Sequence, residues 1–177
     1  GNQLLAIKYV NPNTGFASGS IGTMLKTTNK GTNWLALNSG VNVDLYTLFF
    51  RNENTGYAGG INGTILKTTN GGANWIAQNS GVGTLRRVIE FPTDNIGYAA
   101  GISGVVLKTT NGGMNWLQQT SGTGGVLYSM SFMDTLIGIA GTTGGILQTT
   151  NGGINWNYTI LNIDPKRIIV SAQYINS

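Results

Sequence analysis

The segment Thr68-Thr69-Asn70-Gly71-Gly72-Ala73-Asn74-Trp75 has three near-copies elsewhere in this chain of 177 residues. The four tryptophans that end the copies fall at positions 34, 75, 116 and 156, at intervals of 41, 41 and 40 residues. A fixed interval of that length is typical of a repeat architecture. Each copy follows the pattern Thr-x-Asn-x-Gly-x-x-Trp, at Thr27, Asn29, Gly31 and Trp34; Thr68, Asn70, Gly72 and Trp75; Thr109, Asn111, Gly113 and Trp116; and Thr149, Asn151, Gly153 and Trp156.

Each repeat is expected to form four short strands. In the second copy these strands are predicted at residues 45–51, 56–61, 64–68 and 74–78, with Asn62-Gly63 as a tight hairpin turn. Strict alternation in the first strand predicts that Tyr46, Leu48 and Phe50 share one face. Four-stranded antiparallel units of about 40 residues are typical of propeller blades. We therefore predict an all-β fold, a β-propeller with four blades in residues 1–162: 4–40, 41–81, 82–122 and 123–162.

The Thr-x-Asn-x-Gly-x-x-Trp pattern indicates a structural role. The Thr hydroxyl and the Asn side chain are suited to bonding backbone groups of a turn, and Gly readily takes a positive φ. The Trp is expected to bury a large aromatic surface between blades. The alternative is that these loops bind sugar or Ca²⁺, but no copy has a carboxylate for a hard cation. We expect no metal and no cofactor, and glycan binding has no support in the sequence.

The pattern resembles the Asp-box, or bacterial neuraminidase repeat, with Asn in place of Asp in all four copies. A longer phrase, from Asn54-Thr55-Gly56-Tyr57-Ala58 to Gly63 and the motif at 68–75, is similar to the photosystem II assembly factor-like repeat proteins of secreted bacterial type. The resemblance covers about residues 4–160 and implies a propeller. It does not imply one activity, because such propellers include sialidases, xyloglucan hydrolases, receptors and assembly factors.

Composition excludes several classes of function. Only 9% of residues are charged and 28 are glycine, which is not the composition of a helical bundle. The chain has neither Cys nor His, so disulfides, thiolate metal sites and histidine catalysis are excluded. The ten basic residues are scattered, although a nucleic-acid binder needs a dense basic stripe. No apolar run is long enough to span a membrane, so we expect no membrane insertion.

A glycosidase of sialidase type is the enzymatic alternative. Glu53 and Glu90 are the carboxylates available for an acid and base pair, and Glu90 has Arg86 and Arg87 nearby in the sequence. Turn carboxylates and strand ion pairs are the commoner explanation of such residues. We therefore predict a protein without catalytic residues.

Four basic residues form a candidate partner-binding surface. Lys8, Arg51, Arg86 and Arg87 lie at or near equivalent positions of predicted first strands in three repeats. An assembly factor for a photosystem-like membrane complex would use such a basic surface, as the resemblance implies. Solvated strand ends are the simpler explanation.

Residues 163–177 are surplus to four blades. Residues 169–174 align with 127–132 and resemble the first strand of a fifth repeat, with Ile169, Val170, Ala172 and Tyr174 as candidates for strand addition. Three explanations stay open: the chain is part of a larger propeller, its four blades close alone with the tail as a cap, or the tail pairs with another copy.

The surface chemistry is typical of secreted bacterial β proteins, since charge is low and Asn, Thr, Ser and Gly are abundant. Two glycosylation sequons begin at Asn62 and Asn157. We expect an extracellular or cell-surface binding and assembly module of bacterial type. Its partner is expected to be a protein or further copies of itself, and not nucleic acid.

Overall fold

The computed structural model describes residues 1–83, 87–161 and 168–173. It contains four antiparallel sheets of four strands each, which we call blades 1 to 4 in chain order. The all-β prediction is thereby confirmed. Apart from the strands, the described residues hold two 3-10 turns, η1 (Ser20–Gly22) and η2 (Ile102–Gly104).

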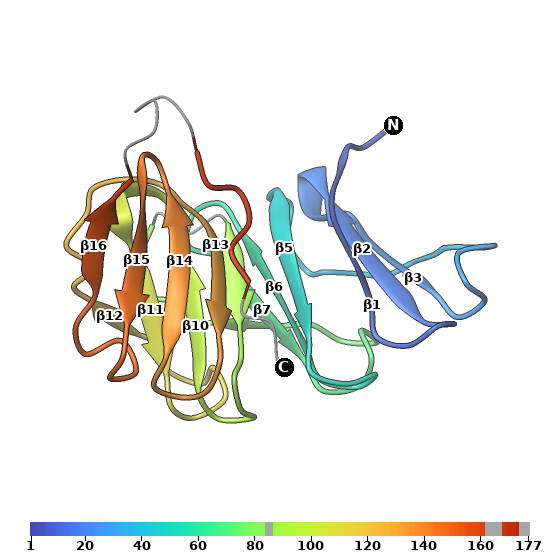
Figure 1. Cartoon of the computed structure of the whole chain (residues 1–177). Helices are drawn as coiled ribbons and strands as arrows, with labels where there is room; N and C mark the ends of the chain where they lie inside the picture. Colours follow the sequence, from blue (N-terminus) through green and yellow to red (C-terminus); the bar gives the residue numbers. More distant parts are fainter. Residues whose placement is uncertain (84–86, 162–167, 174–177) are drawn as a thin grey trace. The chain divides into compact units, whose positions relative to one another are not determined.

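The strands of every blade lie side by side in chain order, as Figure 1 shows for β13 to β16. Their bounds are β1 Leu4–Tyr9, β2 Gly15–Gly19, β3 Met24–Thr27 and β4 Leu35–Ala36 in blade 1; β5 Leu45–Phe50, β6 Gly56–Gly60, β7 Ile65–Thr68 and β8 Ile76–Gln78 in blade 2; β9 Val88–Glu90, β10 Gly97–Ala100, β11 Val106–Thr109 and β12 Leu117–Gln119 in blade 3; and β13 Leu127–Phe132, β14 Gly138–Thr142, β15 Gly145–Thr149 and β16 Asn157–Ile160 in blade 4.

The chain divides into two compact units, Gly1–Ile89 and Glu90–Ser177, and each is described by itself. In the first unit, β5 packs against β1 and β2. In the second unit, β13 packs against β10. In both units, therefore, the first strand of one blade lies against an inner strand of the blade before it.

The second and third strands are joined by tight turns. Asn62 and Gly63 have φ of 57° and 73°, and the Thr64 N–H donates to the Ile61 carbonyl at 3.1 Å. Positive φ at both central residues is the type I′ geometry that Asn-Gly favours. Blade 1 makes the same turn with Ile21 at φ 54°, a conformation that is strained for a β-branched residue.

The prediction of which residues share the inner face of the first strand is wrong at one position. Leu45, Leu48 and Phe50 are buried, whereas Tyr46 is only half-buried. The pairing with β6 shifts register between Leu45 and Thr47, so Tyr46 is an extra residue in the ladder. Such a bulge changes the phase of the alternation and places Leu45 on the buried face. Blades 1 and 4 have the same irregularity.

The second strand of a blade has a small residue where an aromatic ring from the first strand of the same blade lies over it. Phe50 pairs with Gly56, and a Cβ added at Gly56 would lie 2.4 Å from the Phe50 ring. In blade 4, Phe132 covers Gly138 at the same separation. Glycine is thus required where the ring crosses the sheet.

Candidate functional site

The Thr-x-Asn-x-Gly-x-x-Trp segments form identical turns, which we call the motif loops. In blade 3 the Thr109 hydroxyl accepts from the N–H of Gly113 at 2.9 Å and of Asn111 at 3.3 Å, and donates to Asn111 Oδ1 at 2.9 Å. Asn111 Oδ1 also accepts from the Asn115 N–H at 3.0 Å. The glycine of the pattern has φ between 81° and 88° in all four loops. All four repeats make the same bonds, at 27–33, 68–74, 109–115 and 149–155.

Aromatic rings connect neighbouring blades within each unit. Phe16 of blade 1 stacks on Phe50 of blade 2, with ring centroids 3.9 Å apart and planes inclined by 14°. Trp75 meets Phe50 edge to face at 6.0 Å. In the second unit Tyr98 stacks on Phe132 with the same separation and inclination, and Trp156 contacts both rings edge to face. The motif tryptophan therefore packs at the join between two blades.

A lysine on the third strand completes each join, and sequence analysis missed it. Lys26 Nζ donates to the Gly71 carbonyl at 2.9 Å, and Lys108 Nζ donates to the Gly152 carbonyl at 2.6 Å. Each ammonium also lies over the stacked ring of its own blade, 5.2 Å from the centroid of Phe16 and 5.6 Å from that of Tyr98. The sequence signal that could have revealed these lysines is the tripeptide Leu-Lys-Thr, which recurs shortly before the motif asparagine in blades 1 to 3. Blade 4 has Leu-Gln-Thr at the same place.

Burial at this join changes two pKa values. The Tyr98 hydroxyl donates to the Gly152 carbonyl at 2.8 Å, and burial raises the pKa of Tyr98 to about 12. Burial also lowers the pKa of Lys108. Both shifts have the sign expected for groups removed from water, because the charged form is disfavoured.

The predicted basic residues occupy different ends of their strands. Lys8 is an exposed residue near the end of β1, and exposed Arg51 directly follows β5. Arg87 precedes the start of β9, and Arg86 lies outside the described residues. Strand position alone therefore does not bring Arg87 together with Lys8 and Arg51.

Both glutamates of the enzymatic alternative bond to neighbouring blades. Glu53 Oε1 accepts from the Asn11 side chain, and Glu90 Oε1 accepts from the Phe132 N–H at 3.1 Å. Such contacts are structural, and nothing in them is positive evidence for catalysis. Within the described ranges, no group of three or more acidic, Cys or His side chains is placed to hold a metal ion.

The C-terminal segment contacts the hairpin between β14 and β15 of blade 4 in the same chain. Ile168 forms an antiparallel bridge with Thr143, and the Ile169 N–H donates to the Thr142 carbonyl at 3.3 Å. The join between blades 3 and 4 has a matching bond, in which the Leu127 N–H donates to the Gly101 carbonyl at 2.9 Å. Ile169 thus lies where the first strand of a following blade would begin. Val170 and Ala172 continue the described segment, and Tyr174 lies outside it.

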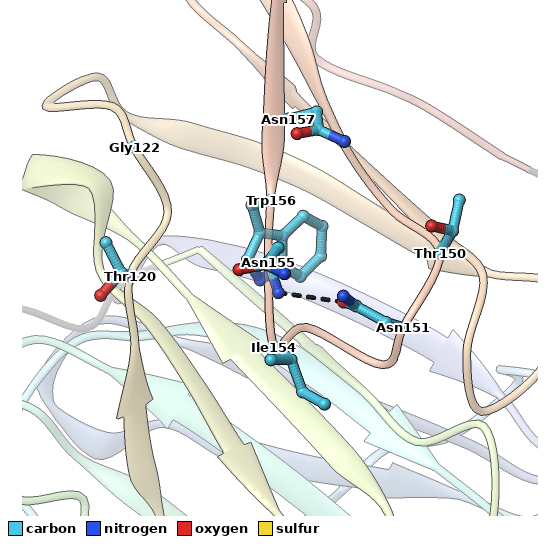
Figure 2. Close-up of a pocket in the computed structure, with 8 residues that line it drawn as sticks. All are labelled: Thr120, Gly122, Thr150, Asn151, Ile154, Asn155, Trp156 and Asn157. Atoms are coloured by element: carbon cyan, nitrogen blue, oxygen red, sulfur yellow. Dashed lines mark hydrogen bonds between the residues drawn. The ribbon is translucent and has the colours of Figure 1, made fainter.

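Uncharged hollows lie beside the outer strands. Figure 2 shows one of about 380 Å³, between Thr120 and Gly122 of blade 3 and the motif loop of blade 4. Amide and hydroxyl side chains line it around Trp156, and the Asn155 N–H donates to Asn151 Oδ1 at 2.9 Å. Two further hollows, which are equivalent to each other, lie behind the hairpin turns of blades 2 and 3. No ionisable side chain lines any of the three.

Both sequon asparagines are exposed. Asn62 lies at the tip of the hairpin between β6 and β7, and Asn157 is the first residue of β16. In residues 1–83, 87–161 and 168–173, no helix has the length and hydropathy needed to cross a membrane.

The chain matches no protein-family model. No curated protein matches its sequence either. Solved structures do match. YCF48 bound to D1 peptide aligns with a TM-score of 0.75 and 16% identity over 98% of this chain and 57% of that chain. YCF48 from Cyanidioschyzon merolae aligns with a TM-score of 0.71 and 21% identity, over 92% of this chain and again 57% of that chain.

An ancestral GH74 enzyme aligns over a smaller share of its own length, with a TM-score of 0.71 and 22% identity over 88% of this chain but 24% of that chain. This chain therefore spans a little over half of each YCF48 chain and about a quarter of the GH74 enzyme. At these identities the likeness concerns the fold. The chain has a β-propeller fold built from antiparallel four-stranded blades.

Proposed function

We propose that this chain is a non-catalytic binding and assembly module that takes up an extended protein segment at the β14–β15 hairpin of blade 4. The observation that carries the proposal is the bond from the Ile169 N–H to the Thr142 carbonyl, which matches the bond between Leu127 and Gly101. A piece of polypeptide already makes main-chain bonds to this hairpin, and main-chain bonds to an extended segment are a recognised source of binding affinity.

The chemistry of the β14–β15 hairpin suits such a ligand. Gly141 leaves room for the incoming backbone, since an added Cβ would lie 2.5 Å from the Ile169 carbonyl oxygen. Ile139 and Ile146 are half-buried and provide apolar contact, while Gln148 is exposed and uncharged. These features favour an apolar, extended segment that provides backbone donors. The segment at 169–174 of a second copy would also qualify, so the same hairpin would support self-assembly.

The test uses the full chain and a fluorescent peptide with the sequence of residues 165–177. In an Ile169→Pro chain the tail loses its N–H donor to the Thr142 carbonyl and releases the β14–β15 hairpin. We expect this variant to bind the peptide at least tenfold more tightly than the wild-type chain, as measured by fluorescence anisotropy. Ala172→Pro, farther along the tail, is the matched control and should bind like the wild type. Equal binding by all three chains, or no saturable binding, would refute the proposal.

The proposed setting is extracellular or at a bacterial cell surface. It is supported by the low charge and the abundant Asn, Thr and Gly of the chain. Periplasmic, surface and secreted fractions of the source cells, probed with an antibody, would test it.

A second candidate function is favoured by the likeness to YCF48 bound to D1 peptide. In this alternative the chain assists assembly of a membrane complex by binding a peptide like D1 peptide through Lys8, Arg51 and Arg87. Binding of D1 peptide should then weaken steeply with salt and fall in an Arg51→Ala, Arg87→Ala variant. Lys30→Ala is the control, because Lys30 is exposed on a motif loop. Absence of saturable D1 binding would reject this alternative.

A further inference from the structure

The hollow between blades 3 and 4 has a lining drawn from both blades. Figure 2 shows Thr120 of blade 3 on one side of it and Asn155, Trp156 and Asn157 of blade 4 on the other. Its volume of about 380 Å³ lies within the range of about 300–1,000 Å³ that is usual for small-molecule sites. All its lining residues belong to the unit Glu90–Ser177, so the hollow is a feature of that unit by itself.

The blade 4 side of the hollow departs from the repeat at the residue after the motif tryptophan. This residue is an exposed aliphatic side chain in blades 1 to 3, at Leu35, Ile76 and Leu117, and it is Asn157 in blade 4. A side-chain amide both donates and accepts hydrogen bonds, whereas an aliphatic group does neither. Blade 4 therefore has a hydrogen-bonding group at the hollow where the other blades have an apolar one.

The blade 3 side of the hollow departs from the repeat as well. Asn38 and Asn79, the counterparts of Thr120, are bonded within their own turns. Their Oδ1 atoms accept from the N–H groups of Gly40 and Gly81 at 2.9 and 3.0 Å. In the part of the chain that the structure describes, the side chains of Thr120, Asn155 and Asn157 make no hydrogen bond. These groups are therefore available to a ligand from both sides of the hollow.

An apolar contact that the first unit makes at the corresponding place is missing here. In blade 1, Leu37 lies against the motif loop of blade 2, since a Cβ added at Gly72 would lie 2.8 Å from Leu37 Cδ1. The counterpart of Leu37 is Gln119, whose Nε2 donates to the Leu117 carbonyl of its own strand at 3.3 Å. The atoms nearest to the equivalent Gly153 belong to aromatic rings and not to Gln119. Polar side chains thus replace an apolar contact at this join.

We propose that this hollow binds an uncharged oligosaccharide. Sugar hydroxyls donate and accept hydrogen bonds, as do the amides and hydroxyls of the lining. Ile154 is 70% exposed and provides apolar surface for the C–H face of a sugar ring. None of the described lining residues is ionisable, so a charged ligand meets no opposite charge there.

The lining also distinguishes a sugar from an extended peptide. A peptide that binds by strand addition pairs with the edge of a strand. Of the described residues that line the hollow, only Asn157 belongs to a strand, and the others lie in loops. The inference goes beyond the proposed function, because the turn at Thr143 and Gly144 between β14 and β15 does not contribute to this lining.

The first test titrates the isotope-labelled full chain with chitotriose and with cellotetraose, and follows the amide signals by nuclear magnetic resonance. At least one of these neutral sugars should shift the signals of Thr120, Asn155 and Asn157, with a dissociation constant of about 1 mM or tighter. The constant should not change with salt, because the lining carries no charge. The acidic tetragalacturonic acid should bind at least about fivefold more weakly, since its carboxylates are desolvated without a partner. Absence of saturable shifts with both neutral sugars, shifts confined to other residues, or equal binding of the acidic sugar would overturn the proposal.

The second test uses variants that place a residue of one repeat at the same position of another. Asn157→Leu gives blade 4 the residue of blade 3 and should weaken sugar binding at least about fivefold, because a hydrogen bond to the ligand is lost. Leu117→Asn is the matched control: it places the same amide on blade 3, outside the lining of this hollow, and should bind like the wild type. Thr120→Asn gives blade 3 the residue of blades 1 and 2 and should also weaken binding, because the Asn side chain bonds to its own turn.

Circular dichroism and thermal melting of each variant check that the fold is kept. Wild-type affinity in folded Asn157→Leu and Thr120→Asn chains, or equal losses in Asn157→Leu and Leu117→Asn, would refute the site. The peptide assay at the β14–β15 hairpin is a separate measurement. Peptide binding without sugar binding would leave the proposed function standing and refute only this inference.

Discussion

Replacing Thr109 by Val tests whether the motif loops hold the blades together. The Thr109 side chain is buried, and Val has nearly the same shape, so the change removes the hydroxyl with little loss of packing. The Gly113 N–H, which donates to that hydroxyl at 2.9 Å, is then left buried without a partner. An orphaned buried donor costs about 1–3 kcal/mol. The bonds to Asn111 are lost as well, so we expect the free energy of unfolding to fall by about 2–3 kcal/mol.

The assay is equilibrium unfolding in urea, followed by tryptophan fluorescence and circular dichroism. The urea concentration at the midpoint should fall, while the slope of the unfolding free energy against urea stays constant, because the surface exposed on unfolding does not change. Thr110→Val is the matched control: Thr110 is the next residue and its side chain is exposed, so its effect should stay within about 0.5 kcal/mol. Thr109→Ser keeps the hydroxyl and should lie between the two. Equal midpoints for the two Val variants would refute the role assigned to the motif hydroxyl.

Three further predictions concern the joins and the turns. The raised pKa of Tyr98 means that its neutral form stabilises the folded state, so this stabilisation should be complete below about pH 10 and be lost toward pH 12. Tyr98→Phe should remove this part of the alkaline decline in melting temperature. The lowered pKa of Lys108 acts in the opposite direction and should remain in the variant. Trp116→Ala should lower the free energy of unfolding by about 3–5 kcal/mol, and a loss below about 1 kcal/mol in urea would contradict its packing role. Ile21→Asn should raise stability by about 1 kcal/mol, because Asn tolerates the positive φ as Asn62 does, and a lower melting temperature would contradict the strain.

Prediction from sequence succeeded where the structure is local. The Asn62-Gly63 turn follows from residues only a few positions apart, and the four-stranded units follow from the spacing of turns. The first strand was less predictable, because one extra residue at Tyr46 changes which side chains face inward. A bulge leaves no clear mark in the alternation of apolar residues.

The candidate site was predicted only in part. The tail was expected to form a following first strand. Ile169 does bond to Thr142, but the described residues 169–173 form no strand. The lysine contacts were missed, because Lys26 and its acceptor Gly71 lie 45 residues apart in sequence. A lysine on a strand is usually solvated, and nothing local indicates that its ammonium meets a carbonyl of the next blade.

The sequence by itself determines the repeat, the turns and the motif loops, since each depends on backbone preferences and on bonds within about six residues. Only the tertiary structure decides how one repeat covers the next. Leu4 and Leu45 occupy equivalent positions, yet one is half exposed and the other is fully buried. The physical reason is that burial belongs to the pair of surfaces in contact and not to the residue. In a repeat protein the equivalent side chain is therefore buried in one unit and exposed in another.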